Sequence, residues 1–440
     1  MSRNICHSDR RQWLQAACAS LAGYSISGFL PLLADSTPAA NRARRHCILL
    51  WMSGGPSQLD TFDLKPGHAN GGPFKAIQTA TPSIRISEHL PQLSKLTDHL
   101  GIVRGLTSKE GDHGRGTFAM RTGRSPDRVV RFPTLGSVIS KELDRGETAL
   151  PGFVAVNPFP AFNPQAYEAG FLGSKFSPLT IKPKDRAPAA NGFAELGVDD
   201  LKPYAPLSEP QLAGRLDLLQ GLQTGLRNQY PGGPIKAHDT ILQRTLQLIN
   251  SEAGQVFDLT QEAPAVRERY GRGRFGQGCL LARRLIERGV SFVEVSLGDQ
   301  GRWDTHNNNF AVVRELSAEL DAGWSSLMDD LASRDLLAST TILWMGEFGR
   351  TPVINGAGGR DHYPNAWTAV LAGGGIKGGQ TWGRTSADGM KVENGMVTPG
   401  DLLATLCAAL GLDPHQQNVS DVGRPFKLAD GKAVNGLLAS

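Results

Sequence analysis

The sequence of 440 residues predicts an α/β fold, a three-layer α/β/α sandwich with a mainly parallel central sheet. Short apolar runs without polar alternation indicate strands that are covered on both faces. Amphipathic segments of helical period alternate with these runs, which is the order that a parallel sheet requires. The 52 glycines and 27 prolines predict long irregular connections between the elements.

The predicted elements alternate along the chain. We expect strands at residues 46–51, 100–106, 153–156, 290–297, 340–345 and 367–372. We expect helices at residues 88–99, 208–230, 237–252, 276–288, 309–333 and 398–410. The last helix has the clearest start, because Thr398 can cap it and Pro399 suits its first position.

The first 34 residues resemble a twin-arginine export signal. Arg10 and Arg11 precede an aromatic residue, a leucine and a weakly apolar run with a small-residue end. Residues 35–44 are interpreted as a linker, and residues 45–440 as a single domain with a loop-rich insertion near 157–206. An uncleaved membrane anchor is the alternative, but glycine, serine and proline interrupt the run, so we expect no stable membrane span. The sequence thus predicts an exported bacterial protein, periplasmic or extracellular.

The net charge of the chain argues against a nucleic-acid-binding protein. The formal net charge is +4, of which residues 1–34 contribute +2 through three arginines and one aspartate. A charge this mild does not indicate a nucleic-acid partner.

Cys47, Cys279 and Cys407 lie in apolar or helical segments, which indicates buried thiols. The segment 271–276 matches a dinucleotide fingerprint, but a helical pattern precedes it where a strand is required.

Metal-type side chains follow several of the predicted strands. Ligands of open α/β sheets gather beyond the carboxyl ends of the strands, so these residues predict a metal site at one sheet edge. Asp304 and His306 are two residues apart, which points both side chains the same way from an extended segment. The candidate metal ligands are Asp60, Asp304, His306, Glu347 and His362.

Simpler roles are open for some of these residues. His113 could cap a helix, and Glu347 could pair with Arg350 three residues further on. Asp60 lies near turn residues, where it could cap a turn. A metal role and a structural role therefore both remain as interpretations of these positions.

Segment 113–124 introduces a family resemblance. In length and ending it resembles the sulfatase signature Cys-x-Pro-Ser-Arg-x-x-x-x-Thr-Gly-Arg, with His113 at the position of the nucleophile. Residues 397–411 are similar to a C-terminal helix of sulfatases, which suggests the alkaline-phosphatase-like superfamily. Within it, the chain from Arg45 onward is identified as a member of the domain of unknown function 1501 family. The phrases that carry this resemblance lie at residues 54–63, 111–114, 346–352 and 359–364.

The resemblance implies an alkaline-phosphatase-like fold that holds one or two divalent ions of zinc, manganese, magnesium or calcium. In this scheme Asp304, His306 and His362 bind the metal, and Glu347 replaces the family's Asp-His pair. His113 completes the site or acts as a base, and Arg350 or Arg124 clamps the oxyanion.

Two functions follow from this scheme. The first is a metal-dependent hydrolase of phosphate or sulfate esters, with a small-molecule or glycan ester as substrate. The alternative is a non-catalytic metal- or glycan-binding exported protein that has lost the nucleophile, because His113 replaces the cysteine or serine.

Overall fold

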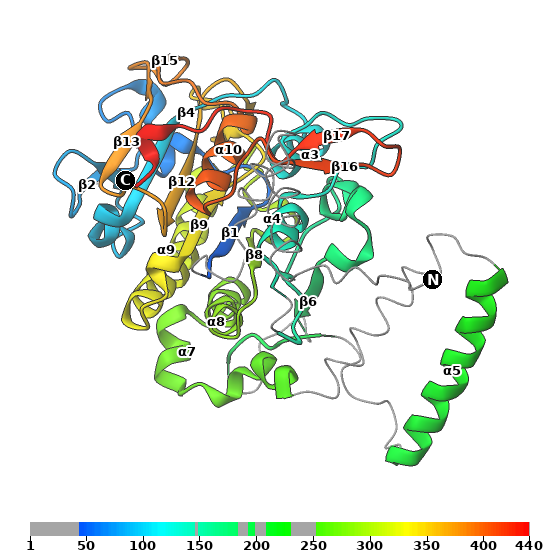
Figure 1. The fold of residues 1–440 in the computed structure, drawn as a ribbon. Coiled ribbons are helices and arrows are strands. Elements are labelled where there is room, and N and C mark those ends of the chain that lie inside the picture. The colour runs from blue at the N-terminus through cyan, green and yellow to red at the C-terminus, as the bar shows by residue number, and fades with distance from the viewer. Residues whose placement is uncertain (1–43, 146–147, 184–191, 199–207, 230–251, 440) are drawn as a thin grey trace, which may run out of the picture. The chain divides into compact units, whose positions relative to one another are not determined.

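A mixed nine-stranded sheet forms the centre of the part of the chain that the structure describes (Figure 1). The computed structural model describes residues 44–145, 148–183, 192–198, 208–229 and 252–439. Residues 45–440 form one compact unit. Across the sheet the strands are β13 (Gln380–Trp382), β4 (Leu100–Leu106), β12 (Trp367–Gly373), β9 (Thr340–Met345), β1 (His46–Met52), β8 (Phe292–Leu297), β5 (Phe153–Val156), β6 (Leu179–Pro183) and β7 (Leu196–Gly197).

Most of this sheet is parallel. The central strand β1 pairs in parallel with β8 on one side and β9 on the other. Strand β12 runs antiparallel to both β9 and β4, and β7 runs antiparallel to β6. The carboxyl ends of β1, β4, β8 and β9 therefore meet at one edge of the sheet.

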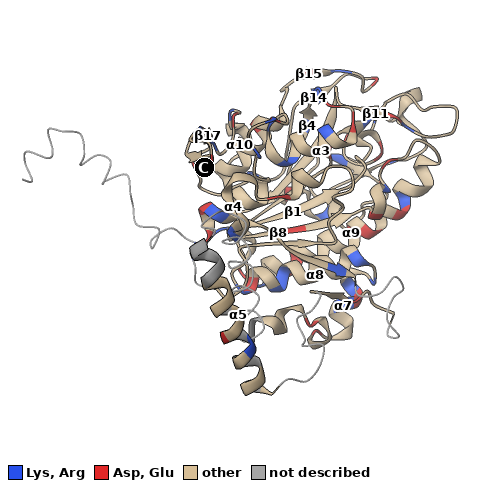
Figure 2. Cartoon of the chain, turned by 90° about the vertical axis from the view of Figure 1, so that its right-hand side faces the viewer, with Lys and Arg blue, Asp and Glu red and all other residues tan. Residues whose placement is uncertain are grey.

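Helices cover both faces of the sheet, as Figure 2 shows for β1 and β8. All seven residues of β1 are buried because its side chains alternate between two helical layers. Ile48 and Leu50 belong to the same apolar cluster as residues of α8 (Arg274–Glu287) and α9 (Asn309–Ser333). Leu49 and Trp51 belong to a cluster with residues of α4 (Leu135–Leu143) and α10 (Pro399–Ala409). The other α-helices of the described residues are α3 (His113–Thr122), α5 (Glu209–Gln229) and α7 (Pro264–Tyr270).

In the described residues, four short two-stranded sheets lie outside the main sheet. They are β2 (Ala76–Gln78) with β3 (Arg85–Ser87), β10 (Gly349–Arg350) with β11 (His362–Tyr363), β14 (Arg384–Thr385) with β15 (Val392–Asn394), and β16 (Gln417–Val419) with β17 (Pro425–Lys427). The hairpin of β10 and β11 matters most for function, because Arg350 lies opposite His362 in its register.

A buried ion pair joins α3 to the sheet. The guanidinium of Arg121 donates two hydrogen bonds to the carboxylate of Glu294 on β8, at 2.9 and 2.6 Å, and both side chains are buried. The same guanidinium lies 3.7 Å from the ring centroid of Tyr167. This pair fixes where α3 lies on the sheet, and with it the position of His113 at the start of the helix.

The structure confirms the predicted fold class and each predicted strand, and it corrects one local prediction. The helix expected at 88–99 is wrong: only a 3-10 helix forms, at Leu93–His99 (η4). Pro91 interrupts the segment, and the carboxylate of Asp321 accepts the N–H groups of Gln92 and Leu93.

Two short strands form within the insertion expected near 157–206. The insertion contributes β6 and β7 to one end of the main sheet. The helix expected at 237–252 lies almost entirely outside the described residues, as does the N-terminal signal. Within the described ranges, no helix combines the length and apolar character that crossing a bilayer demands.

Candidate metal centre

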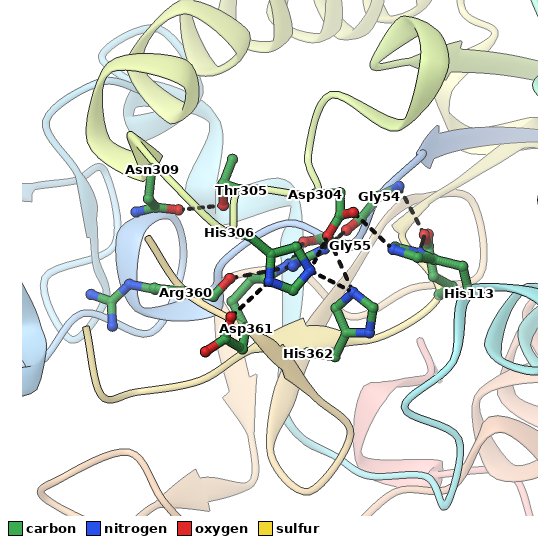
Figure 3. Close-up of polar contacts among 12 residues, drawn as sticks. Gly54, Gly55, His113, Asp304, Thr305, His306, Asn309, Arg360, Asp361 and His362 are labelled. Atoms are coloured by element: carbon green, nitrogen blue, oxygen red, sulfur yellow. Dashed lines mark hydrogen bonds and ion pairs between the residues drawn. The ribbon is translucent and has the colours of Figure 1, made fainter. Parts of the chain in front are cut away.

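Segments that are far apart in the sequence bring imidazoles and carboxylates together at the carboxyl edge of the sheet (Figure 3). Asp304 and His306 come from the loop after β8, and His362 comes from β11. His113 is the first residue of α3, where the Asp112 side chain caps the helix by accepting the N–H of Arg115. The predicted meeting of these residues at one sheet edge is what the structure shows.

A glycine turn after β1 lets these segments come close. Gly54 has a φ of +108°, and a Cβ at this position would lie 2.4 Å from both the nitrogen of Asp304 and the oxygen of Gly301. No other residue type fits there without displacing the Asp304 loop. The Gly54 N–H also donates to Oε1 of Glu347 at 2.8 Å, so one turn contacts two of the candidate residues.

The orientation of His362 is fixed by a backbone carbonyl. Its Nδ1 lies 2.7 Å from the oxygen of Gly111, which can only accept a hydrogen bond. Nδ1 must therefore carry the proton, and in the neutral ring Nε2 presents a lone pair. His306 has the same arrangement, with its Nδ1 2.6 Å from Oδ1 of Asp361.

The two Nε2 atoms converge on Asp304. They lie 3.0 Å from each other, and they lie 3.0 Å (His306) and 3.2 Å (His362) from Oδ1 of Asp304. Two lone pairs at this separation repel unless a proton or a cation lies between them. Two imidazole nitrogens and one carboxylate oxygen form a donor set that first-row transition metals accept, so the residues fit a bound metal ion.

His113 lies on the other side of Asp304. Its Nε2 is 3.2 Å from Oδ2 of Asp304, and its Nδ1 is 2.7 Å from Oε1 of Glu347. Burial alone would lower the pKa of His113, but hydrogen bonds to Asp304 and Glu347 raise the pKa to about 9. His113, Asp304 and His362 together also offer ligand atoms within 4.8 Å of one another.

Asp304 is kept ionised by its neighbours. Burial would raise the pKa of its carboxyl group, but hydrogen bonds from His113 and His362 and the charge of Arg350 hold the pKa well below its usual range. Arg350 is fully buried, and its Nη2 lies 2.7 Å from Oδ1 of Asp304. Its other N–H groups donate to the carbonyls of Gly54, Gly55 and Arg360. This geometry makes Arg350 a positioning residue for Asp304.

Glu347 lies next to His113 rather than next to the histidine pair. Its Oε1 accepts from Gly54 and His113, and its Oε2 is buried without a hydrogen-bond partner among the described residues. The carboxylate therefore orients His113.

Comparison with known proteins places the chain in a family. Residues 44–438 match the family described as "Protein of unknown function (DUF1501)". The chain belongs to the DUF1501 family. The resemblance predicted from the sequence motifs is thereby confirmed. No curated protein matches the sequence.

Solved structures resemble this DUF1501 chain weakly. A phosphonate monoester hydrolase of Agrobacterium radiobacter aligns with a TM-score of 0.42 and 11% identity, over 90% of this chain and 77% of that one. A protein in the alkaline phosphatase superfamily from Vibrio parahaemolyticus aligns with a TM-score of 0.41 and 12% identity, over 90% and 71%. A putative sulfatase from Bacteroides thetaiotaomicron aligns with a TM-score of 0.40 and 11% identity, over 89% and 74%. At these low scores the likeness says nothing about what the DUF1501 chain binds or transforms.

Two residues predicted for the site lie apart from the centre in this DUF1501 chain. Asp60 is fully buried, and its carboxylate accepts from Arg360 at 2.8 and 3.1 Å and from Asn309 at 2.9 Å. Arg124 follows the far end of α3, where it pairs with Asp430 and donates to the carbonyl of Lys427. Neither side chain contacts Asp304, His306 or His362.

Sequence reasoning did not assign three features of the centre. Asp361 orients His306, the Gly111 carbonyl orients His362, and the ring of Phe162 stacks on His113 with 4.1 Å between the ring centroids. The adjacency of Asp361 to His362 was a usable signal for the first. Nothing in the sequence indicates a backbone carbonyl as partner, or which aromatic residue of the insertion covers His113.

Proposed function

We propose that this chain is a metal-dependent hydrolase of phosphate or sulfate esters, with one divalent ion held by Asp304, His306 and His362. One observation carries the proposal: the Nε2 atoms of both histidines lie 3.0 Å apart and face the same oxygen of Asp304. Their Nδ1 atoms are already engaged by Asp361 and Gly111, as is usual for histidines that bind metals.

The donor set favours some metals over others. Magnesium and calcium prefer oxygen ligands, and here two of the three donors are imidazole nitrogens. Zinc accepts two histidines and one carboxylate in catalytic sites, and manganese accepts mixed nitrogen and oxygen ligands. Among the four ions that the sequence suggested, zinc and manganese therefore fit best.

The surrounding residues support hydrolysis by water. A bound divalent ion would lower the pKa of a coordinated water and polarise the ester oxygen. His113 has neither hydroxyl nor thiol, so the position of the sulfatase nucleophile cannot form a covalent intermediate of that kind. Glu347 holds the Nδ1 side of His113, and Nε2 faces Oδ2 of Asp304, so His113 would hold a proton beside the carboxylate that binds the metal. Arg350 keeps Asp304 in place from behind.

One observation favours a second function. Because the nucleophile position is His113 and the Arg124 side chain lies apart from the centre, the chain lacks two groups that a sulfatase-type mechanism would use. A non-catalytic metal- or glycan-binding protein would keep the Asp304 centre and show no turnover. Activity measurements therefore decide between the two functions.

Export is part of the proposal and rests on Arg10 and Arg11. Replacing both by lysine is expected to retain the protein in the cytoplasm of a bacterial host, because twin-arginine signals depend on the arginine pair. Unchanged export of that variant, measured by cell fractionation, would contradict this part of the proposal.

The main test combines metal content with turnover. The mature protein, purified without chelators or a histidine tag, is expected to contain about one equivalent of zinc or manganese by elemental mass spectrometry. We expect it to hydrolyse nitrophenyl phosphate or nitrophenyl sulfate, and His306→Ala/His362→Ala to lose both the metal and the turnover.

A matched control removes two exposed histidines elsewhere. His99→Ala/His415→Ala changes the same number of imidazoles outside the centre, so metal content and turnover should equal those of the wild type. Absence of metal after reconstitution would refute the proposal. Metal retention without turnover on any phosphate or sulfate ester would support the non-catalytic alternative instead.

A further inference from the structure

A loop of residues 355–359 lies against the backbone of His306. Hydrogen bonds within the loop close it, because the Asn355 N–H donates to the carbonyl of Gly359 at 2.9 Å and the Gly358 N–H donates to the carbonyl of Asn355 at 3.0 Å. A Cβ at Gly359 would lie 2.0 Å from the carbonyl oxygen of His306. Only glycine therefore lets the loop come this close to the candidate metal centre.

The same loop supplies hydrogen-bond acceptors at the start of α9. Asn308 precedes this helix, and its side chain makes no capping hydrogen bond. The carbonyls of Ala357 and Gly358 instead accept the N–H groups of Asn308 and Asn309, at 3.2 and 3.1 Å. Because the first N–H groups of a helix have no partner within the helix, these bonds join the loop to the segment that carries His306.

The side chain of Asn355 makes hydrogen bonds through both of its polar atoms. Its Oδ1 accepts the N–H groups of Ala357 and Gly359 at 3.0 and 2.9 Å. Backbone N–H groups only donate, so the atom that faces them is the oxygen and the amide nitrogen points the other way. Nδ2 donates to the carbonyl of His306 at 2.9 Å and to Oδ1 of Asp361 at 3.3 Å. One amide therefore joins the closed loop to both partners.

The contact with Asp361 bears on the orientation of the His306 ring. Oδ1 of Asp361 accepts from Nδ1 of His306 at 2.6 Å and from Nδ2 of Asn355. The Asp361 carboxylate is more than half exposed, so its neighbours leave it room to rotate. A second donor to the same oxygen restricts that rotation, and it thereby restricts the ring that the oxygen holds.

We propose that Asn355 is a positioning residue for His306. The Asn355 amide holds the Asp361 carboxylate, and Asp361 in turn holds the imidazole with Nε2 toward Asp304. Metal binding by His306 rests on the proposed function, whereas the orientation of its ring in the metal-free protein does not.

NMR of metal-free protein labelled with ¹⁵N-histidine tests the ring orientation. At a pH where the ring is neutral, the long-range ¹H–¹⁵N signals of His306 should show one tautomer in the wild type, with the proton on Nδ1. In Asn355→Ala the Asp361 carboxylate loses its second donor, so the signals should shift toward a mixture of both tautomers.

Asn418→Ala is the matched control. Nδ2 of Asn418 also lies 3.3 Å from a carboxylate oxygen, that of Glu142, but outside the candidate metal centre. This substitution removes the same kind of contact, so the His306 signals should equal those of the wild type.

Affinity for zinc, measured by competition with a chelator, tests the same link without any ester hydrolysis. Asn355→Ala should bind zinc about tenfold more weakly, a loss that is typical of residues that orient a metal ligand. In the Asp361→Ala background the same substitution should have little further effect, because the residue through which Asn355 acts is gone.

The inference is overturned if the His306 signals of Asn355→Ala and wild type are alike, or if Asn355→Ala and Asn418→Ala weaken zinc binding equally. It is also overturned if the losses of Asn355→Ala and Asp361→Ala add fully, because Asn355 would then act by another route. Wild-type protein that binds no zinc would instead refute the proposed function, and the NMR comparison would still decide the role of Asn355.

Discussion

Oδ1 of Asp361 lies 2.6 Å from Nδ1 of His306, and this contact turns Nε2 of His306 toward Asp304. Asp361 is itself more than half exposed, and the hydrogen bond from His306 lowers the pKa of its carboxyl group. The carboxylate is therefore ionised at neutral pH and makes His306 a better electron-pair donor.

Asp361→Ala is expected to weaken metal affinity by about 10–100-fold, because the ring of His306 loses its orienting partner. Competition with a chromogenic chelator measures this affinity. Asp98→Ala, which removes another exposed carboxylate, should leave it unchanged. Equal affinities of Asp361→Ala and wild type would show that His306 is not a ligand in the proposed arrangement.

The metal-free protein should lose stability at alkaline pH through His113. Its pKa is about 9 in the folded state, above the usual value of 6.5, so its contribution is fully present below pH 6.5 and is lost as the pH rises through 9. Urea unfolding of chelator-treated protein should therefore show a difference between wild type and His113→Gln that shrinks by up to about 3 kcal/mol from pH 6 to pH 10. A difference that stays constant would contradict the ion pairs of His113 with Asp304 and Glu347.

Breaking the buried pair of Arg121 and Glu294 should lower the free energy of unfolding strongly, whereas replacing both residues by apolar ones should lower it little. Arg121→Ala leaves the Glu294 carboxylate buried without a partner, which typically costs about 3–5 kcal/mol. In Arg121→Met/Glu294→Leu no buried charge remains, so most of that loss should be recovered. Urea unfolding of both variants measures the two values; a double variant as unstable as the single one would show that the pair itself stabilises the fold.

Asp60→Asn tests whether the Asp60 carboxylate has a structural role or binds the metal. Asp60 pairs with buried Arg360, so the substitution should lower the free energy of unfolding by a few kcal/mol. Metal content per folded protein should stay at the wild-type value, because Asp60 does not reach the histidine pair. Folded Asp60→Asn without metal would instead identify Asp60 as a ligand, as the sequence alone suggested.

The pattern of apolar and polar residues along the chain predicts the central strands and part of the candidate metal centre. The apolar runs locate β1, β8 and β9 because strands buried on both faces have no polar alternation, and the residues after them locate Asp304 and His306 near one edge. The pattern could not show that Asp60 has a structural role rather than a metal-binding one. That role comes from its ion pair with Arg360, which lies 300 positions further on in the sequence. The pattern could not place Arg124 either, because the length of α3 moves that side chain away from His113. Strand β6 lacked a signal because it lies next to the edge strand β7, where its residues are mostly only partly buried and are of mixed character.

The central position of β1 has a consequence for how the chain is made. Strand β1 ends at Met52, but its two neighbours, β8 and β9, are complete only when Leu297 and Met345 have been added. At translation rates of about 5–20 residues per second, the heptapeptide His46–Met52 waits roughly 15–60 s for both partners. During that time an apolar strand with two unpaired edges is accessible to other chains. Cellular yield of this protein should therefore depend on chaperones that shelter the nascent N-terminal half, and slow synthesis should increase its aggregation.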